Sequence, residues 1–195
     1  MTAGLAAGFD DAAHEAQQVF RTMLDAFAHP GRIVALPSKV EAPAPLSPAS
    51  AAVLLTLVDR DTPLFLAADF LTEETTRYVR FHTGAPLVAR KADAVFAVVA
   101  ADRAPLLDGF AIGSDAYPDR SATLVIELPS LRGGPRRILR GPGIETITEI
   151  SVAGLADSFW REWATNKALF PCGVDVVFAA GTELMALPRG IAVEV

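Results

Sequence analysis

The chain has 195 residues, of which 51% are hydrophobic and 21% are charged, and its formal net charge is −6. This composition excludes a disordered chain, and a fold of this size buries enough apolar surface to be stable without disulfides. The negative charge excludes a general nucleic-acid binder, which needs clustered lysine and arginine to displace counterions from phosphates.

The sequence also predicts the compartment. The single cysteine, Cys172, cannot form an internal disulfide. The stretch from Met1 to Gly8 lacks the basic segment and the apolar core of a signal peptide. No apolar run reaches the ~18 residues that are needed to span a bilayer. We therefore expect a cytoplasmic protein that makes no contact with membranes.

Helices and strands alternate in the first half of the chain. A helix is predicted over 12–28, because Asp10 and Asp11 can cap it, apolar residues recur at helical spacing, and His29-Pro30-Gly31 ends it. A second helix is predicted over 49–58, with Ser47 as its cap, and a third from Thr72 to Thr83. Strands are expected at 32–36, 64–66 and 94–100, the last buried on both faces.

Strands dominate the second half. A loop-rich segment, 101–120, precedes a strand at 123–128, and 136–139 is its predicted hairpin partner. Further strands are expected at 146–152, 174–178, 184–187 and 191–195, with an amphipathic helix at 155–169. This order predicts an α/β fold with a mixed sheet and helices on its faces. No linker or repeat divides the chain, so residues 1–195 are expected to form a single domain.

Several kinds of catalytic or metal site are disfavoured. Gly141-Pro142-Gly143 is the nearest approach to a phosphate loop, but the proline removes an amide donor, so a turn is predicted. One cysteine cannot build a zinc site, and nothing near Cys172 in sequence would activate its thiol, which indicates an inert residue at the edge of the core. The three histidines lack the spacing of metal ligands; they are His14, His29 and His82.

The most suggestive constellation is Arg80-Phe81-His82-Thr83 at a predicted helix end. Its guanidinium, imidazole and hydroxyl can each donate to an anionic oxygen, which favours a ligand site. The alternative is that Arg80 and His82 cap the helix and satisfy its free carbonyls. The residues alone leave both interpretations open.

Two further groups of charged residues have competing interpretations. Asp59 and Asp61 can hold a hard cation or serve as acid and base, but aspartates in turns usually bond their own backbone, and we favour the turn. Four arginines within nine residues favour a solvated edge strand, ahead of a contact with an acidic protein or with polyphosphate. These four are Arg132, Arg136, Arg137 and Arg140.

Short motifs in a fixed order make the chain resemble a known family. It is similar to the H subunit of the bacterial carbon–phosphorus lyase (phosphonate-utilisation) system, the PhnH family, over nearly its whole length. The motifs are Phe20-Arg21, Pro30-Gly31, Leu54-Leu55-Thr56-Leu57, Asp61-Thr62-Pro63, Arg80-Phe81-His82-Thr83, Gly141-Pro142-Gly143-Ile144, Phe170-Pro171 and Leu187-Pro188-Arg189. The segment from Ala101 to Asp108 departs most from the family pattern.

The resemblance implies a three-layer α/β/α sandwich like the large domain of pyridoxal-phosphate-dependent transferases, without the cofactor. Lys39, Lys91 and Lys167 agree with this, since none has the shielded surroundings of a Schiff-base lysine. The family implies a homodimer when isolated, and assembly with the G, I and J subunits of the system. Together with G, I and an ATPase-like L protein, it supports displacement of adenine from ATP by an alkylphosphonate, giving a ribose alkylphosphonate triphosphate.

Three hypotheses follow. The first is a required subunit that contributes no catalytic residue of its own and needs no cofactor or metal. The second is a homodimer that binds phosphonate or nucleotide through candidate residues Arg80, His82, Thr83, Asp61 and Arg189. The third is an independent enzyme that uses Asp59 or Asp61 with a metal.

Overall fold

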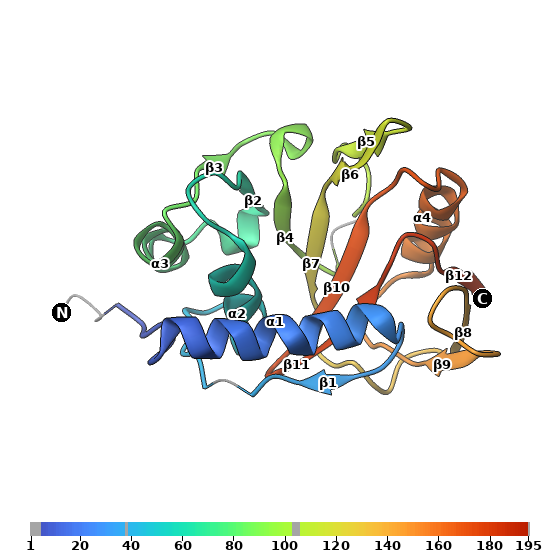
Figure 1. The fold of residues 1–195 in the computed structure, drawn as a ribbon, viewed down its shortest axis with the longest axis horizontal. Helices are drawn as coiled ribbons and strands as arrows, with labels where there is room; N and C mark the ends of the chain where they lie inside the picture. The colour runs from blue at the N-terminus through green and yellow to red at the C-terminus, as the bar shows by residue number, and fades with distance from the viewer. Residues whose placement is uncertain (1–4, 38, 103–105, 195) are drawn as a thin grey trace.

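A mixed sheet of seven strands forms the centre of the computed structural model, which describes residues 5–37, 39–102 and 106–194 (Figure 1). The strand order is β1-β11-β10-β7-β4-β2-β3. The five strands from β10 to β3 run parallel, β11 pairs antiparallel with β10, and β1 pairs antiparallel with β11. The strands are β1 (Val34–Ala35), β2 (Leu64–Leu66), β3 (Leu87–Val88), β4 (Phe96–Ala100), β7 (Thr123–Glu127), β10 (Asp175–Ala180) and β11 (Glu183–Leu187).

Three helices cover one face of this sheet. They are α1 (Ala12–Ala28), α2 (Pro48–Leu57) and α3 (Glu73–Thr83). Asp11 caps α1 by accepting a hydrogen bond from the His14 amide, and Val19, Met23 and Ala26 form its buried stripe. The core of this layer joins the helices to one set of alternating strand residues, represented by Val98, Val125 and Val177.

Helix α2 is the central element of that layer. Ser47 caps it through the Ser50 amide, and Pro48 occupies the first turn, where it removes no helical hydrogen bond. All residues from Ala49 to Leu54 are buried. α2 therefore has no solvent-facing stripe in this part, and α1, α3 and β10 pack around it.

The other face carries a layer of mixed composition. It contains α4 (Asp157–Ala168) and a three-stranded antiparallel sheet of β12 (Ala192–Glu194), β8 (Arg137–Arg140) and β9 (Thr148–Ile150). Phe159, Trp160 and Trp163 of α4 pack against the opposite set of strand residues, which includes Ile126 and Phe178. Figure 1 shows α4, β8, β9 and β12 together at one end of the sheet.

Most predicted elements are confirmed. The helix over 12–28 has the predicted bounds, and the caps Ser47 and Thr72 are confirmed. β4 lies between β2 and β7 and is buried on both faces, as expected. The strand predicted at 32–36 is shorter, since only Val34 and Ala35 pair. Val195, at the end of the last predicted strand, lies outside the described residues.

Two predictions are wrong. Residues 136–139 do not pair with 123–128, because β4 and β10 already occupy both edges of β7, and β8 pairs with β9 and β12 instead. The segment 101–120 contains β5 (Ile112–Ser114), which pairs with β6 (Tyr117–Ser121). Its strands are mostly exposed and lack apolar alternation, so pattern alone did not indicate them.

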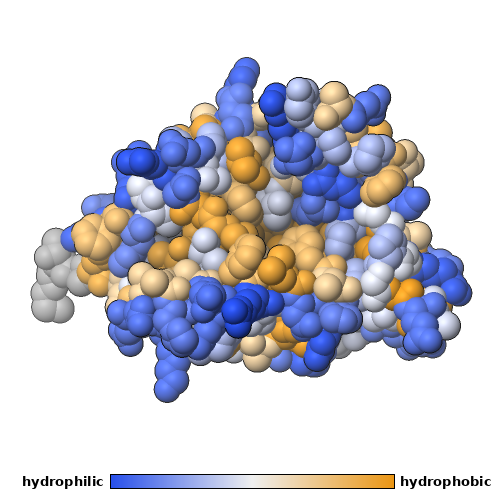
Figure 2. Space-filling model, viewed as in Figure 1, coloured by the Kyte–Doolittle hydropathy of each residue, from blue (hydrophilic) through white to orange (hydrophobic). Residues whose placement is uncertain are grey.

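The face seen in Figure 1 is hollowed near its middle. Figure 2 shows apolar residues gathered in this hollow and hydrophilic residues around much of its rim. Contiguous exposed apolar surface of this kind marks binding sites for proteins or ligands. Among the described residues, no helix has the length and apolar character needed to cross a bilayer.

Asn166 provides a test of how α4 is fixed to the sheet. Its side chain donates to the Val174 carbonyl (2.9 Å) and accepts from the Val174 amide (2.8 Å), and both bonds are buried. Asn166→Ala leaves both backbone groups without partners, so we expect a loss of about 2–4 kcal/mol in the free energy of unfolding. Urea denaturation measures it. The neighbouring exposed Thr165→Ala should change this free energy by less than about 0.5 kcal/mol, and an equal loss in both variants would contradict the role of Asn166.

Candidate functional site

Helix α3 carries the best-formed candidate site. Thr72 caps it through the Thr75 amide, and Gly84, in the left-handed conformation, ends it. Thr75, Tyr78 and Val79 face the core. Residues three and four apart are neighbours on a helix, so Glu74 and Arg77 lie next to each other. Both lie on the flank of the helix turns that hold the core-facing residues. α3 therefore presents two charged side chains beside a buried tyrosine.

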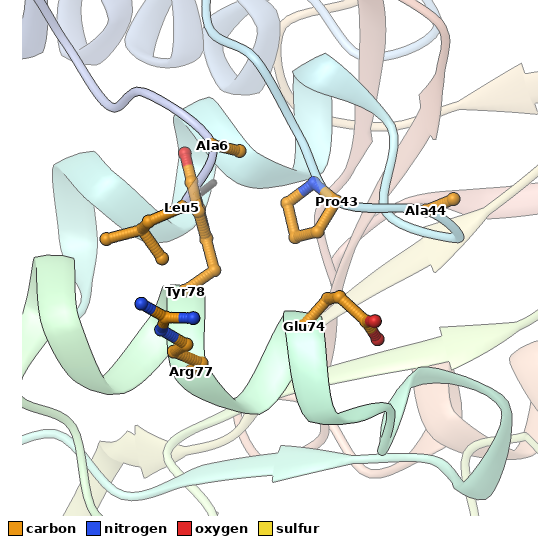
Figure 3. A pocket seen from close by; sticks show the side chains of 7 residues that line it. All are labelled: Leu5, Ala6, Pro43, Ala44, Glu74, Arg77 and Tyr78. Carbon is orange, nitrogen blue, oxygen red and sulfur yellow. The ribbon is translucent and has the colours of Figure 1, made fainter. Parts of the chain in front are cut away.

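A cavity of about 300 Å³ lies beside these residues (Figure 3). Its charged and polar lining comes from α3, namely Glu74, Arg77 and Tyr78. Its apolar lining comes from the N-terminal segment, Leu5 and Ala6, and from the loop before α2, Pro43 and Ala44. A small, mostly apolar pocket with a few polar groups is the usual form of a ligand site.

Tyr78 is the unusual residue of this pocket. It is only 1% exposed, and its hydroxyl has no hydrogen-bond partner among the described residues. Burial raises the pKa of Tyr78 to about 12, so the group is a neutral phenol at physiological pH. Buried hydroxyls in folded proteins are normally paired, and among the described residues the Tyr78 hydroxyl shares the lack of a partner with buried polar atoms of Ser50, Ser121 and Arg137.

His82 holds the wall of the pocket in place. Its Nε2–H donates to the carbonyl of Ala6 (3.0 Å), and its ring lies 4.6 Å from the Tyr78 ring, centroid to centroid. A Cβ on Gly8 would lie 2.9 Å from His82 Nδ1, so the N-terminal segment packs closely against the imidazole. His82 thus positions Leu5 and Ala6 over Tyr78.

The helix-end interpretation of Arg80 and His82 is wrong. Thr83 donates its hydroxyl to the Val79 carbonyl (2.8 Å), and the Gly84 amide donates to the Arg80 carbonyl. No hydrogen bond joins the Arg80 or His82 side chain to a carbonyl of this helix end in the described part of the chain, and His82 binds the Ala6 carbonyl instead. Arg80 lies on the exposed side of α3 and lines an open groove with Leu71 and Phe81.

Asp61 and Arg189, the other two predicted ligand residues, lie on separate elements. Asp61 is exposed in the turn after α2. Arg189 follows β11, forms an ion pair with Asp175, and donates to the carbonyl of Pro118 (2.7 Å). Within the described part of the chain, no hydrogen bond or ion pair joins any two of the five predicted residues. The structure does not assemble them into one site, and ligand binding by them stays a prediction.

The turn interpretation of Asp59 is confirmed. Its carboxylate accepts from the Asp61 amide (3.0 Å) and from the Thr62 hydroxyl (2.6 Å). The bond from Thr62 is the main cause that lowers the pKa of Asp59. Across residues 5–37, 39–102 and 106–194, no three His, Cys, Asp or Glu side chains form a cluster able to hold a metal.

The four clustered arginines are all paired within the chain. Their ion pairs are Arg132–Glu183, Arg136–Glu149, Arg137–Asp157 and Arg140–Glu194. Three of these pairs are largely exposed, as expected for solvated side chains. The predicted edge strand is wrong, because β8 is the middle strand of its sheet and pairs with both β12 and β9. Arg137 differs, since its side chain is 9% exposed and lies over the Trp160 ring. Arg136, Arg137 and Arg140 therefore tie β8 and the residue before it to β9, α4 and β12, whereas Arg132 pairs with β11.

Two smaller predictions are confirmed. Gly141-Pro142-Gly143 forms a turn in which the Ile144 amide donates to the Gly141 carbonyl. Gly143 has φ +81°, and a Cβ there would lie 2.3 Å from the Ala28 carbonyl oxygen, so the turn needs glycine. Cys172 is a buried free cysteine, which agrees with its expected place at the edge of the core.

Sequence reasoning missed two residues of interest, Tyr78 and Glu127. Tyr78 reads as part of an apolar helix stripe, and only the fold shows that its hydroxyl is unpaired. Glu127, at the end of β7, accepts from the Ser47 amide (2.7 Å) at the start of α2. Burial is the largest influence on Glu127 and raises its pKa above 4.5, although hydrogen bonds from the start of α2 oppose the effect.

Comparison with known proteins identifies the family. The model of the bacterial phosphonate metabolism protein (PhnH) family matches residues 7–194. The chain is 44% identical over 182 residues to alpha-D-ribose 1-methylphosphonate 5-triphosphate synthase subunit PhnH of Rhizobium meliloti (strain 1021), covering 93% of this chain and 91% of that protein. It is 31% identical over 174 residues to the protein HtxG of Stutzerimonas stutzeri, which is provisionally named a C-P lyase subunit. This match covers 89% of this chain and 83% of HtxG. The chain therefore belongs to the PhnH family.

The raised pKa of Glu127 predicts a pH-dependent contribution to stability. Because the folded protein holds this proton more tightly than the unfolded chain, the contribution is fullest below pH 4.5 and is lost as pH rises through the folded-state pKa. Glu127→Gln should abolish it. We expect the free energy of unfolding of the wild type, relative to this variant, to fall as the pH rises above 4.5, measured by urea denaturation. The exposed Glu145→Gln serves as the control, and a wild-type advantage over Glu127→Gln that stays constant or grows with pH would refute the assignment.

Proposed function

We propose that this protein is a required subunit of a carbon–phosphorus lyase system that degrades organophosphonates. It supports formation of a ribose 1-alkylphosphonate 5-triphosphate from ATP and an alkylphosphonate. The observation that carries the proposal is the family match over residues 7–194, together with 44% identity to a named subunit of the methylphosphonate synthase. A full-length match of this extent supports a shared role rather than a shared fold alone.

The arrangement of polar residues supports action within a complex. The candidate ligand groups are dispersed, and several are engaged in structural contacts: His82 with Ala6, Thr83 with Val79, and Arg189 with Asp175. A chemical step on ATP needs a nucleophile, a leaving-group acid and charged contacts held together. We infer that companion subunits supply those groups.

We propose the G, I and J subunits of the system as these companions, and a homodimer for the isolated chain in the cytoplasm. Exposed apolar side chains support docking. Phe20 and Leu24 lie one turn apart on α1, while Phe81, 71% exposed, and Leu71, 56% exposed, lie at the two ends of α3. Exposed aromatic residues beside arginine, as in Phe81 beside Arg80, are typical of the residues that dominate interface energies.

The open groove that Arg80 lines with Leu71 and Phe81 favours a second candidate function, a homodimer that binds phosphonate or nucleotide. Arg77 and Arg80 both line this groove, which has a volume of about 760 Å³, and neither has an ion-pair partner in the described part of the chain. Guanidinium groups suit phosphonate and phosphate oxygens. In this alternative Arg80 contacts the anion, with His82, Thr83, Asp61 and Arg189 as the remaining predicted contacts.

For the architecture, we propose one domain over residues 1–195 and a likeness to the large domain of pyridoxal-phosphate-dependent transferases. The support is that both core layers pack on the same mixed sheet. One outer layer is helical, whereas the other combines α4 with three strands, so the α/β/α description holds for the first face more fully than for the second.

Deletion of the gene tests the proposed function. The deletion strain should not grow with methylphosphonate as sole phosphorus source, because the complex lacks a required subunit, and it should grow normally on phosphate. The wild-type gene on a plasmid should restore growth, and so should the exposed-surface variant Glu145→Gln. Normal growth of the deletion strain on methylphosphonate would reject the proposal.

A further inference from the structure

A short segment before α1 packs against α3 without forming a helix or a strand. This segment, residues 5–9, is named the N-terminal strap. Its side chains Leu5, Ala6 and Phe9 are half-buried and contact the core layer that contains the three helices. Figure 3 shows Leu5 and Ala6 opposite the side chains of α3. The strap therefore covers part of this core layer while lying outside its regular structure.

Few interactions hold the strap in place. Among the described residues, one hydrogen bond joins it to the rest of the chain, from His82 Nε2–H to the Ala6 carbonyl (3.0 Å). Its packing is also incomplete, because Leu5 and Ala6 line a cavity of about 300 Å³ together with α3 and the loop at Pro43-Ala44. Segments with few hydrogen bonds and few buried contacts are the ones that open first in a folded protein.

Tyr78 weakens the closed arrangement further. Its ring lies 4.6 Å from the His82 ring, centroid to centroid, and it lines the same cavity as Leu5 and Ala6. The Tyr78 hydroxyl is buried without a hydrogen-bond partner in the described part of the chain. A buried hydroxyl without a partner destabilises the closed state relative to a state in which water reaches it. Removal of the strap relieves this cost.

The start of α1 does not depend on the strap. Asp11 caps the helix by accepting from the His14 amide. The Glu15 carboxylate accepts from the amides of Asp10 (2.8 Å) and Asp11 (3.0 Å). These bonds lie within the first turn and satisfy the free donors of the helix end. The first turn of α1 can therefore stay folded when the strap moves, and Asp10 is the point at which detachment stops.

We propose that residues 5–9 are a displaceable strap, which detaches from α3 as a unit while the rest of the fold stays intact. In the closed state His82 holds the Ala6 carbonyl. In the detached state water reaches Tyr78, and the apolar side chains beneath the strap become accessible. The strap thus keeps an apolar surface covered in the free chain and makes it available for binding only after detachment. The inference goes beyond the proposed subunit role and does not depend on it.

Gly8 offers a full-length variant that opens the strap. A Cβ at Gly8 would lie 2.9 Å from Nδ1 and 3.0 Å from Cε1 of His82. The imidazole has little room to move away, because the rings of Tyr78 and Phe81 lie 4.6 Å and 4.9 Å from it, centroid to centroid. Gly8→Val should therefore push the strap off α3. Ala7→Val places the same residue at an exposed neighbouring position and is the matched control.

Limited proteolysis of the full-length chain with chymotrypsin measures detachment. Cleavage after the half-buried Phe9, identified by mass spectrometry, requires the strap to be free. We expect this cleavage to be about tenfold or more faster in Gly8→Val than in the wild type, and unchanged within about twofold in Ala7→Val. In Tyr78→Phe it should be about threefold or more slower, because the closed state no longer contains an unpaired hydroxyl.

The urea dependence of cleavage separates detachment from global unfolding. In the wild type, cleavage after Phe9 should rise much less steeply with urea than cleavage after Phe178 in the buried strand β10, because detachment exposes few residues. Equal steepness at both sites would overturn the proposal. So would equal cleavage after Phe9 in Gly8→Val and Ala7→Val, or cleavage in Tyr78→Phe that is no slower than in the wild type. Loss of a cooperative thermal transition in Gly8→Val would also reject it, because the strap would then belong to the global fold.

Discussion

Helix α2 has no polar stripe along its buried turns, and the need to cover it on every side organises one whole layer of the molecule. Residues 49–54 are all buried, so the sheet, α1 and α3 must each contact this helix. A helix that is apolar all round is stable in water only inside such a layer. Its amino end also needs partners, which Ser47 and Glu127 supply. The position of α2 therefore depends on burial along its length and on hydrogen bonds at its start.

The placement of α3 follows from this constraint and creates the pocket. Thr75, Tyr78 and Val79 turn toward the core, which leaves Glu74 and Arg77 on the flank of the same helix. The tyrosine hydroxyl is carried into an apolar setting without a partner, an arrangement that costs roughly 1–3 kcal/mol. The N-terminal segment, held by His82, covers it.

Elements set by local chemistry were predictable from the sequence, and those set by tertiary pairing were not. Caps such as Asp11, Ser47 and Thr72 act within a few residues, so the bounds of α1, α2 and α3 followed from pattern. The pairing of β8 depended on both edges of β7 being occupied by strands distant in sequence. The same limit applied to side chains. Nothing local shows that His82 binds Ala6, that the clustered arginines meet acids far along the chain, or that the Tyr78 hydroxyl stays unpaired.

The central claim is that this chain contributes surface and binding to a shared reaction and does not complete that reaction alone. Reconstitution with the purified companion subunits encoded in the same genome, with ATP and methylphosphonate as substrates, tests it most directly. Release of adenine should require the full set, should stop when this chain is omitted, and should be absent with this chain alone. Adenine release by the chain alone, or at an undiminished rate without it, would contradict the account.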